Sequence, residues 1–222
     1  MIGTPNRDRQ AERREATRQE ILTAAWDVAR QNGIAGLTLR EVAVRVGMRP
    51  PSLYSHFASK NAIYDAMFGQ AWQDCMDWMT RAMADAPRAP RARLVALALA
   101  FFDYAMTDVE RFQLMNVRVL PDFTPSADAY RPAVDCIEAG RAYVSELGIT
   151  RDEDFDLYTA LLAGLLSQQQ ANDPHGTRWR DLVPKAMDMF ADAAGLPAGP
   201  EKSGPRRSRP TKAARQNSGR KS

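Results

Sequence analysis

Between residues 33 and 60 the chain reads Gly33-Ile-Ala-Gly-Leu-Thr-Leu-Arg-Glu-Val-Ala-Val-Arg-Val-Gly-Met-Arg-Pro-Pro-Ser-Leu-Tyr-Ser-His-Phe-Ala-Ser-Lys60. Thr38 and Glu41 have the spacing of a capping box and predict a short helix that ends at Gly47. A second short helix is predicted over Pro50–His56, because proline is favourable in a first helical turn. Two short helices joined at Gly47 and Met48 have the size of a helix-turn-helix. Apolar residues are expected to hold this pair against a preceding helix: Leu39, Val42, Ala43, Val46, Leu53 and Phe57.

The flanking sequence is also helical in pattern. Apolar residues recur at spacings of three and four and no stretch alternates as a strand would, so the fold is predicted to be all α. Thr17 and Glu20 form another capping box and predict a helix that Gly33 ends. Ser59 is expected to cap a long helix that ends near Arg81. Further helices are expected over residues 91–106, 108–119, 127–147, 152–170 and about 179–194, and Thr150 is expected to cap the fourth of these. In the last helix, Pro184 requires either a start near Leu182 or a kink.

Charge is unevenly distributed along the 222 residues. Residues 1–64 carry ten Lys and Arg against six Asp and Glu, residues 65–194 carry twelve against twenty, and residues 195–222 carry eight against one. Basic ends around an acidic middle indicate that the ends meet an anion. We expect a flexible arm over 1–13, a DNA-binding domain over 14–74, a helical body over 75–195 and a basic tail over 196–222. The tail is expected to be disordered because it has almost no apolar residues.

Other functional classes find little support in the sequence. Cys75 and Cys136 have no metal-binding or redox spacing and are expected to be free thiols. Apolar runs are too short for a membrane span, the N-terminus has no signal-peptide character, and a cytoplasmic location is expected. The chain has two histidines, His56 and His175, and no phosphate loop or nucleophile motif, so no enzyme, metal site or cofactor is predicted. The acidic cluster of residues 152–156 is expected to favour a helix N-terminus rather than to bind a metal.

The segment from Asn32 to Phe68 resembles the DNA-binding domain of the TetR family. The string Leu53-Tyr-x-His-Phe-x-x-Lys60 is specific for that family, and the resemblance covers roughly residues 14–74. It implies an all-α regulator with an N-terminal helix-turn-helix and a variable helical body that dimerises and often binds a small molecule. Carried over residue by residue, it implies DNA contacts from Thr38, Arg40, Arg49, Pro50, Pro51, Ser52, Tyr54, Ser55, His56 and Lys60.

These residues are expected to divide into two roles. Arg40 and Arg49 lie at adjoining helix starts and are interpreted as major-groove contacts, although both could merely be solvated. Tyr54, His56 and Lys60 match the phosphate contacts of the family. The alternatives are that Tyr54 packs beside its apolar neighbours and that His56 is a satisfied helix-end histidine. Pro50 and Pro51 remove backbone donors from the helix start, so side chains are expected to do more of the anchoring.

Predictions for the body are based mainly on the resemblance. The helix over 152–170 carries a broad apolar stripe with Gly164 inside it, and the helix over 182–194 is amphipathic. Together they are predicted to form a homodimer interface; the alternative is an ordinary core. A pocket for an apolar or aromatic effector is predicted from aromatic and methionine side chains, although such residues more often form core. The candidate ligand-binding residues are Trp72, Met76, Trp78, Phe101, Tyr104 and Met115.

The function predicted from the sequence is a ligand-responsive transcriptional repressor that binds a palindromic operator as a homodimer. A non-specific or architectural DNA-binding protein is the alternative, and the recognition-helix string argues against it. A helical enzyme or small-molecule carrier would require a catalytic constellation that the sequence lacks. The basic tail indicates sequence-independent attraction to DNA or a role in solubility.

Overall fold

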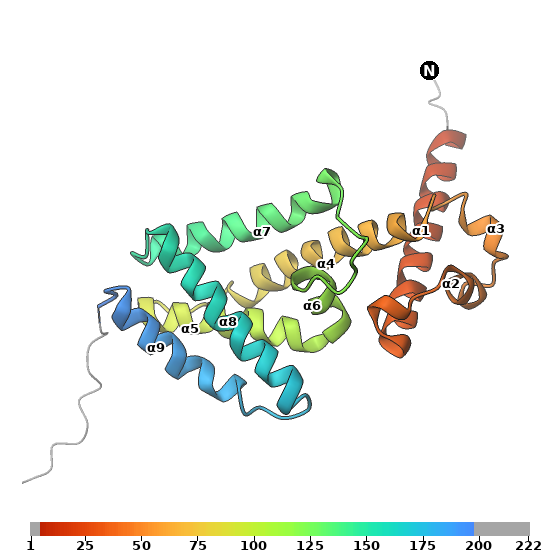
Figure 1. Ribbon diagram of the computed structural model, residues 1–222. Coiled ribbons are helices and arrows are strands. Elements are labelled where there is room, and N and C mark those ends of the chain that lie inside the picture. The colour runs from red at the N-terminus through yellow and green to blue at the C-terminus, as the bar shows by residue number, and fades with distance from the viewer. Residues whose placement is uncertain (1–4, 198–222) are drawn as a thin grey trace, which may run out of the picture.

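The computed structural model of the chain describes residues 5–197, and all regular secondary structure within that range is helical (Figure 1). None of the described helices is both long and apolar enough to cross a membrane. The α-helices are α1 (Pro5–Asn32), α2 (Leu39–Arg45), α3 (Pro50–Leu53), α4 (Lys60–Ala82), α5 (Pro90–Thr107), α6 (Val109–Asn116), α7 (Ala127–Glu146), α8 (Asp152–Asn172) and α9 (Val183–Ala193), and the two 3-10 helices are η1 (Ile34–Gly36) and η2 (Arg180–Leu182).

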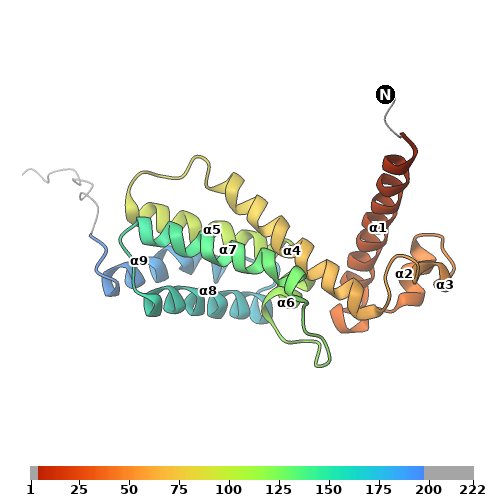
Figure 2. The same cartoon turned by 90° about the horizontal axis from the view of Figure 1, so that it is seen from above.

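The molecule is elongated, with α1, α2 and α3 at one end and α5, α8 and α9 at the other (Figure 2). The long helix α4 connects the two ends, because its first half packs into the helix-turn-helix and its second half into the body. Two apolar cores follow from this arrangement. One joins α1–α4 with parts of α6 and α7, and the other joins α5, α7, α8 and α9. The chain therefore has the predicted N-terminal helix-turn-helix domain and a helical C-terminal domain.

The helix-turn-helix begins and ends where local signals predict. Thr38 caps α2 and its side chain accepts the backbone N–H of Glu41. Gly33 and Gly47 have φ values of 75° and 70°, a region that side chains other than glycine rarely enter. Ser59 caps α4 by accepting the N–H of Ala62. The helix expected over Pro50–His56 is shorter, since α3 ends at Leu53 and turns carry the chain on to His56.

The first helix corrects the sequence interpretation. We expected it to start at the Thr17 capping box after a flexible arm over 1–13, but α1 starts at Pro5. The Thr17 hydroxyl donates to the carbonyl of Arg13 within the helix instead of capping a new one. The physical reason is that the residues before Thr17 are rich in Arg, Glu, Gln and Ala, which favour helix continuation over a cap.

The ends of the body helices differ in detail from the expected ones. Arg151 rather than Thr150 is the N-cap residue of α8, and its guanidinium bonds Asp154 at 2.9 Å through two nitrogens. Pro184 lies in the first turn of α9, so of the two predicted possibilities the structure has the helix start near Leu182. The body also extends beyond residue 195, because Leu196 is buried and Arg91 donates to the carbonyls of Leu196 and Pro197. The remaining residues of the predicted tail lie outside the described part of the chain.

Candidate nucleic-acid interface

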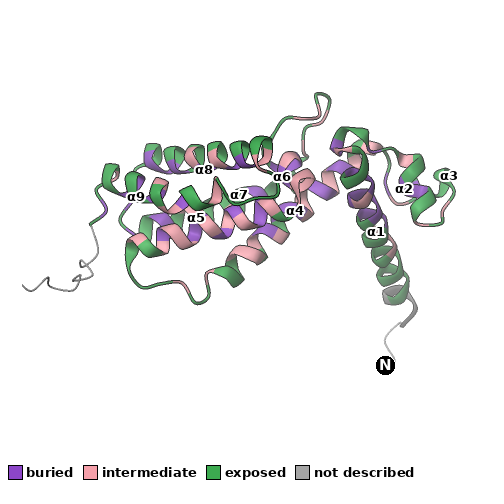
Figure 3. Ribbon diagram, turned by 90° about the horizontal axis from the view of Figure 1, so that it is seen from below, coloured by how far each residue is buried: buried purple, intermediate pink, exposed green. Residues whose placement is uncertain are grey.

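The turn between α2 and α3 is held by backbone hydrogen bonds. The N–H of Met48 donates to the carbonyl of Ala43 at 2.8 Å, after Gly47 reverses the chain. Arg49 then adopts an extended conformation as the N-cap residue of α3, with φ −77° and ψ 141°. Leu53 and Phe57 are buried beneath the short helix. This packing fixes one face of α3 and leaves the opposite face to solvent at the end of the molecule (Figure 3).

Most of the predicted DNA-binding residues lie on this exposed surface. Arg40 and Arg49 are exposed and have no hydrogen bond or ion pair to another described residue, so both guanidinium groups are free to contact a ligand. Tyr54 has 54% of its surface exposed, which argues against the alternative that it packs into the core. The residues that are exposed on α3 and its flanks are Arg49, Pro50, Pro51, Ser52, Tyr54 and Ser55.

Two of the predicted contacts have competing partners within the protein, and a third is half-buried. The Thr38 hydroxyl bonds the Glu41 carboxylate at 2.5 Å as part of its cap. Lys60 is half-buried, donates to the carbonyl of Ala35 at 3.4 Å and lies 5.2 Å from the centre of the Tyr64 ring. His56 is also half-buried, and its Nδ1 atom has no hydrogen-bond partner. These groups must reorient or share their partners to reach a phosphate.

Two arginines that the sequence interpretation did not single out hold the recognition segment in place. Arg14 donates to the carbonyl of Ser55, and Arg18 donates to the carbonyl of His56. The Arg18 guanidinium also lies 4.2 Å from the centre of the Phe57 ring. These carbonyls follow the end of α3, where carbonyl groups have no partner within the helix. α1 therefore positions the segment that would enter a DNA groove. The available signal was the spacing of Arg14 and Arg18, one helical turn apart beside the buried face of α1.

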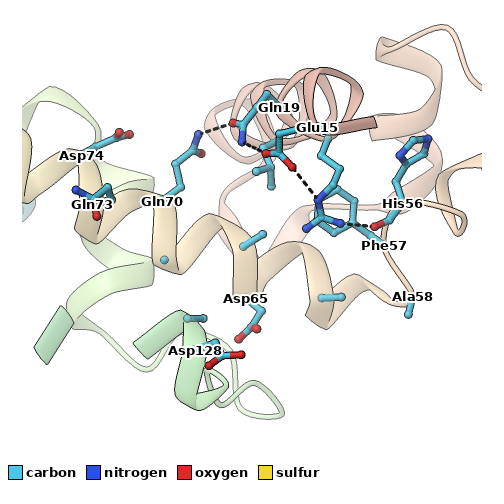
Figure 4. A pocket seen from close by; sticks show the side chains of 16 residues that line it. Glu15, Gln19, His56, Phe57, Ala58, Asp65, Gln70, Gln73, Asp74 and Asp128 are labelled. Atoms are coloured by element: carbon cyan, nitrogen blue, oxygen red, sulfur yellow. Dashed lines mark hydrogen bonds and ion pairs between the residues drawn. The ribbon is translucent and has the colours of Figure 1, made fainter. Parts of the chain in front are cut away.

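A cavity of about 730 Å³ lies behind the helix-turn-helix, between α1, α4 and the start of α7 (Figure 4). Its walls include the carboxylates of Glu15, Asp65 and Asp128. Gln19 donates to Glu15 at 2.8 Å and accepts from Gln70, so the polar groups along α1 are largely satisfied within the protein. An acidic wall repels phosphate, so this cavity is less suited to an anionic partner than the exposed α2–α3 side.

The predicted ligand-binding residues do not form one site. Trp78 and Tyr104 line a cavity of about 380 Å³ where α1, α4, α5 and α6 meet. Trp72 and Met115 are buried in the core around the helix-turn-helix, and Met76 and Phe101 are half-buried. Of these side chains the cavity includes Trp78 and Tyr104 alone, whose rings are tilted at 51° to each other with centres 6.2 Å apart.

The same cavity is more polar than the sequence predicted, because six charged side chains from α1, α4 and the α5–α6 junction line it. Asp108 accepts from Arg30 at 2.8 Å and pairs with Arg111, which also bonds Asp74. Burial opposes the charged form of Arg111, but the hydrogen bond and charge of Asp74 outweigh it and raise the pKa of Arg111. Burial raises the pKa of Tyr104 and keeps its phenol protonated. The charged residues of the wall are Arg30, Asp74, Asp77, Arg81, Asp108 and Arg111.

Exposed apolar side chains occur along α8, at the end of η2 and along α9, on the side away from the core. Leu157, Leu182 and Met189 have 47%, 40% and 65% of their surfaces exposed. Gly164 is exposed, and a Cβ atom at that position would meet no atom within 4 Å. The acidic start of α8 serves structure, since Asp154 is buried and paired with Arg151. Within residues 5–197, no group of three or more His, Cys, Asp or Glu side chains is placed to hold a metal ion.

Comparisons with known proteins agree with this geometry at the helix-turn-helix. Residues 21–67 match the family model of the bacterial regulatory proteins, tetR family. The class A tetracycline repressor protein from transposon 1721 of Escherichia coli is 43% identical over 47 residues, which cover 21% of this chain and 22% of that protein. The first curated relatives align over about a fifth to about a half of their own length. The family-model match therefore lies in the helix-turn-helix end of the chain.

Solved structures extend the likeness to the body, as fold alone. A protein with unknown function from a Rhodococcus species superimposes with a TM-score of 0.69 at 22% identity and covers 79% of this chain and 94% of its own. The TetR family transcriptional regulator PfmR from Thermus thermophilus does so with a TM-score of 0.56 at 21% identity, covering 77% of this chain and 96% of its own. Residues 21–67 of this chain therefore match the helix-turn-helix domain of the tetR family, and the described length has the fold of a solved TetR-family structure.

Proposed function

We propose that this regulator is a ligand-responsive repressor that binds a palindromic DNA operator as a homodimer. The observation that carries the proposal is the exposed polar face of α3, held from behind by Arg14 and Arg18 in the domain that matches the tetR family model. A helix presented in this way is suited to the major groove, which admits an α-helix. An architectural protein that binds any sequence needs no such helix.

Base reading is assigned to Arg40 and Arg49. Both guanidinium groups are free of partners among the described residues, and an arginine can contact the edge of a guanine through two hydrogen bonds. Pro50 and Pro51 have no backbone N–H to offer a phosphate, so anchoring falls to side chains such as Tyr54 and Lys60. Phosphate contacts position the protein without reading sequence.

Dimerisation is assigned to α8 and α9. Their outward side chains include exposed leucine and methionine, and Gly164 leaves room for a second helix to approach closely. A two-fold axis through this face relates two recognition helices, and such symmetry is mirrored in a palindromic operator. The acidic charge of residues 65–194 is consistent with a body that stays away from DNA.

The effector is assigned to the cavity beside Trp78 and Tyr104. The adjacent rings of Trp78 and Tyr104 suit an aromatic or apolar group, as the sequence predicted. Arg81 has no ion pair with any described residue and is available to an anionic group. We therefore expect an aromatic carboxylate to be a suitable ligand. The wall includes the Arg30–Asp108 pair that joins α1 to the start of α6, so a ligand that competes for Arg30 would loosen the helix-turn-helix from the body. Release of DNA requires that the ligand prefer this loosened state.

Selection from a random DNA library with the full chain, followed by footprinting upstream of its own coding region, tests operator binding. The expected result is one palindromic sequence bound at least about a thousandfold more tightly than bulk DNA at the same salt concentration. Equal affinity for selected and bulk DNA would favour the architectural alternative instead.

Tryptophan fluorescence with matched pairs of aromatic carboxylates and their uncharged amides tests the effector assignment. We expect a carboxylate that quenches emission to release the selected operator, and Arg81→Ala to weaken its binding while leaving operator affinity intact. Arg88→Ala, on the loop before α5 and outside the cavity, is the matched control. Preference for the amides would count against the assigned site. Quenching without release of DNA would count against a coupling between effector binding and operator binding.

A further inference from the structure

Helices α4 and α7 lie side by side and run in the same direction (Figures 1 and 2). Asp65 accepts from the backbone and side chain of Ser126 at 2.7 and 2.6 Å, and Phe68 stacks on Tyr130 with ring centres 5.9 Å apart. A Cβ atom on Gly69 would lie 3.4 Å from the carbonyl oxygen of Ala129, so the backbones approach closely. The paired residues differ by 60 to 62 in number along this stretch.

This register places the two cysteines of the chain opposite each other, because Cys75 and Cys136 differ by 61. Both belong to the same packed apolar core, where Cys75 is fully buried and Cys136 is half-buried. A disulfide between helices needs Cα atoms roughly 4.4–6.8 Å apart, a separation that closely packed helices provide. The pairing is invisible in the spacing of the sequence and follows from the packing of α4 against α7.

The two thiols are chemically different. The side-chain interaction with Cys136, together with burial, raises the pKa of the Cys75 thiol. The interaction with Cys75 lowers the pKa of the Cys136 thiol from its ordinary value, although burial opposes this change. The thiolate is the reactive form of cysteine. Cys136 thus combines the lower pKa with access to solvent, while Cys75 is sheltered next to it.

We propose that Cys75 and Cys136 are a thiol modification site, which a hydroperoxide oxidises to an intrachain disulfide that ties α4 to α7. The Cys136 thiolate attacks a peroxide oxygen, the O–O bond breaks and the leaving oxygen takes up a proton, so that Cys136 becomes a sulfenic acid. The Cys75 sulfur then attacks the Cys136 sulfur, and the S–O bond breaks. The Cys75 proton leaves with the hydroxide as water. Two thiols are oxidised and one hydroperoxide is reduced.

The disulfide would act on the helix that carries the DNA-binding end. Its sulfurs are covalently joined about 2.0 Å apart, so the bond fixes the position of α4 against α7 at this level. The first half of α4 contributes Ile63, Tyr64 and Met67 to the core of the helix-turn-helix. Fixing α4 against α7 therefore restricts how the helix-turn-helix can adjust to DNA in a dimer, and we expect oxidation to weaken operator binding about tenfold. This effect on DNA rests on the proposed function, whereas formation of the disulfide does not.

Treatment of the reduced full chain with hydrogen peroxide, followed by mass spectrometry without reductant, tests the site. We expect each chain to lose two hydrogen atoms and to yield one linked peptide pair containing Cys75 and Cys136, reversed by dithiothreitol. Cys75→Ala should stop at a Cys136 sulfenic acid that dimedone traps, and Cys136→Ser should leave Cys75 as the thiol. Cys75→Ser is a second variant in case the alanine disturbs the buried position. An intermolecular disulfide, or an unreactive Cys136 in the folded chain, would overturn the proposal.

Binding of the selected operator before oxidation, after oxidation and after reduction tests the consequence. We expect the tenfold loss in the wild-type chain and no disulfide-dependent loss in Cys75→Ala. A disulfide that forms without changing operator affinity would overturn the regulatory half of the proposal. If no operator is found at all, the proposed function fails, and the peptide pair still decides the modification site.

Discussion

The helix-turn-helix end and the body of this protein expose different chemistry. The first presents two arginines without partners among the described residues, Arg40 on α2 and Arg49 before α3. The second presents apolar side chains on α8 and α9 over an acidic background. Sequence identity to the class A tetracycline repressor is confined to 47 residues, while the likeness to solved structures extends over the body as fold alone. A surface that enters a DNA groove must match a fixed partner, whereas a helical body needs only to bury its apolar faces.

The largest effect is expected at the body surface. Gly164→Arg places a long charged side chain on the α8 face, where it meets open space in a single chain and a second helix in the proposed dimer. We expect the substituted chain to fold, to sediment as a monomer and to lose operator binding more than a hundredfold, because one recognition helix alone contacts half the site.

Gly164→Ala is the matched control for this prediction. Its methyl group meets no atom within 4 Å in the chain, and alanine favours a helix over glycine by about 1 kcal/mol. It should remain dimeric and at least as stable as the wild type. An arginine variant that still sediments as a dimer and binds the operator would show that the interface lies elsewhere.

The next effect is expected behind the recognition segment. Arg18→Ala removes the donor to the His56 carbonyl and the cation above the Phe57 ring. Hydrogen bonds to charged groups contribute about 1.5–3 kcal/mol. We expect operator affinity to fall about tenfold through loss of order in α3, with the circular dichroism spectrum little changed. Arg18→Lys keeps the charge but not the planar group, and should recover little of the loss; full recovery would instead indicate a simple charge effect on DNA.

These two regions also differ in how far the sequence predicted them. Thr38, Gly47 and Ser59 act within a few residues of their own positions, so the caps and the turn of the helix-turn-helix followed from local patterns. The start of α1 did not follow from a local pattern. The Thr17 capping pattern competes with continuation of the helix, and in the structure the helix continues through Thr17.

Contacts between residues far apart in the sequence could not be predicted from the sequence. Arg18 bonds a backbone carbonyl 38 residues away, and any residue type can supply a carbonyl. The cavity beside Trp78 gains its charged wall from α1, α4 and α6, which converge only in the folded chain. The apolar side chains assigned to the pocket therefore divided between core and cavity, since helical periodicity identifies a buried face without saying what it faces.

A smaller and more selective effect is expected on the DNA-facing surface itself. Arg49→Ala should lose about 1–3 kcal/mol of discrimination at one base pair in each half-site, because its free guanidinium can bond a guanine edge. Lys60→Ala should weaken all sequences about equally and reduce the slope of log affinity against log salt by about one.

Library selection with each variant separates these roles. Arg40→Ala serves as a second test of base reading on α2, and Arg45→Ala, whose side chain is already bonded to Gln31 and Asp27, serves as a control for loss of positive charge. If Arg49→Ala keeps the full base preference while Lys60→Ala loses it, the assignment of roles is inverted.

The smallest effect is expected from the basic C-terminal segment. Residues 198–222 contain eight Lys and Arg and one acidic residue, so their removal should weaken binding to every DNA sequence and flatten the salt dependence. The ratio of operator to bulk affinity should stay unchanged, because a charge that attracts phosphates reads no bases. An unchanged salt slope would show that the segment takes no part in DNA binding.

The position of the cut decides whether this measurement concerns charge or folding. A chain ending at Pro197 keeps the buried Leu196 and the two carbonyls that Arg91 bonds, and should match the intact protein in its free energy of unfolding. A chain ending at Gly195 loses them, and burial of a leucine side chain is worth about 1.5–3 kcal/mol. We therefore expect the shorter chain to unfold at lower urea concentration, while both chains show the same reduced salt slope. Equal stability of the two would place the C-terminal limit of the folded body before Leu196.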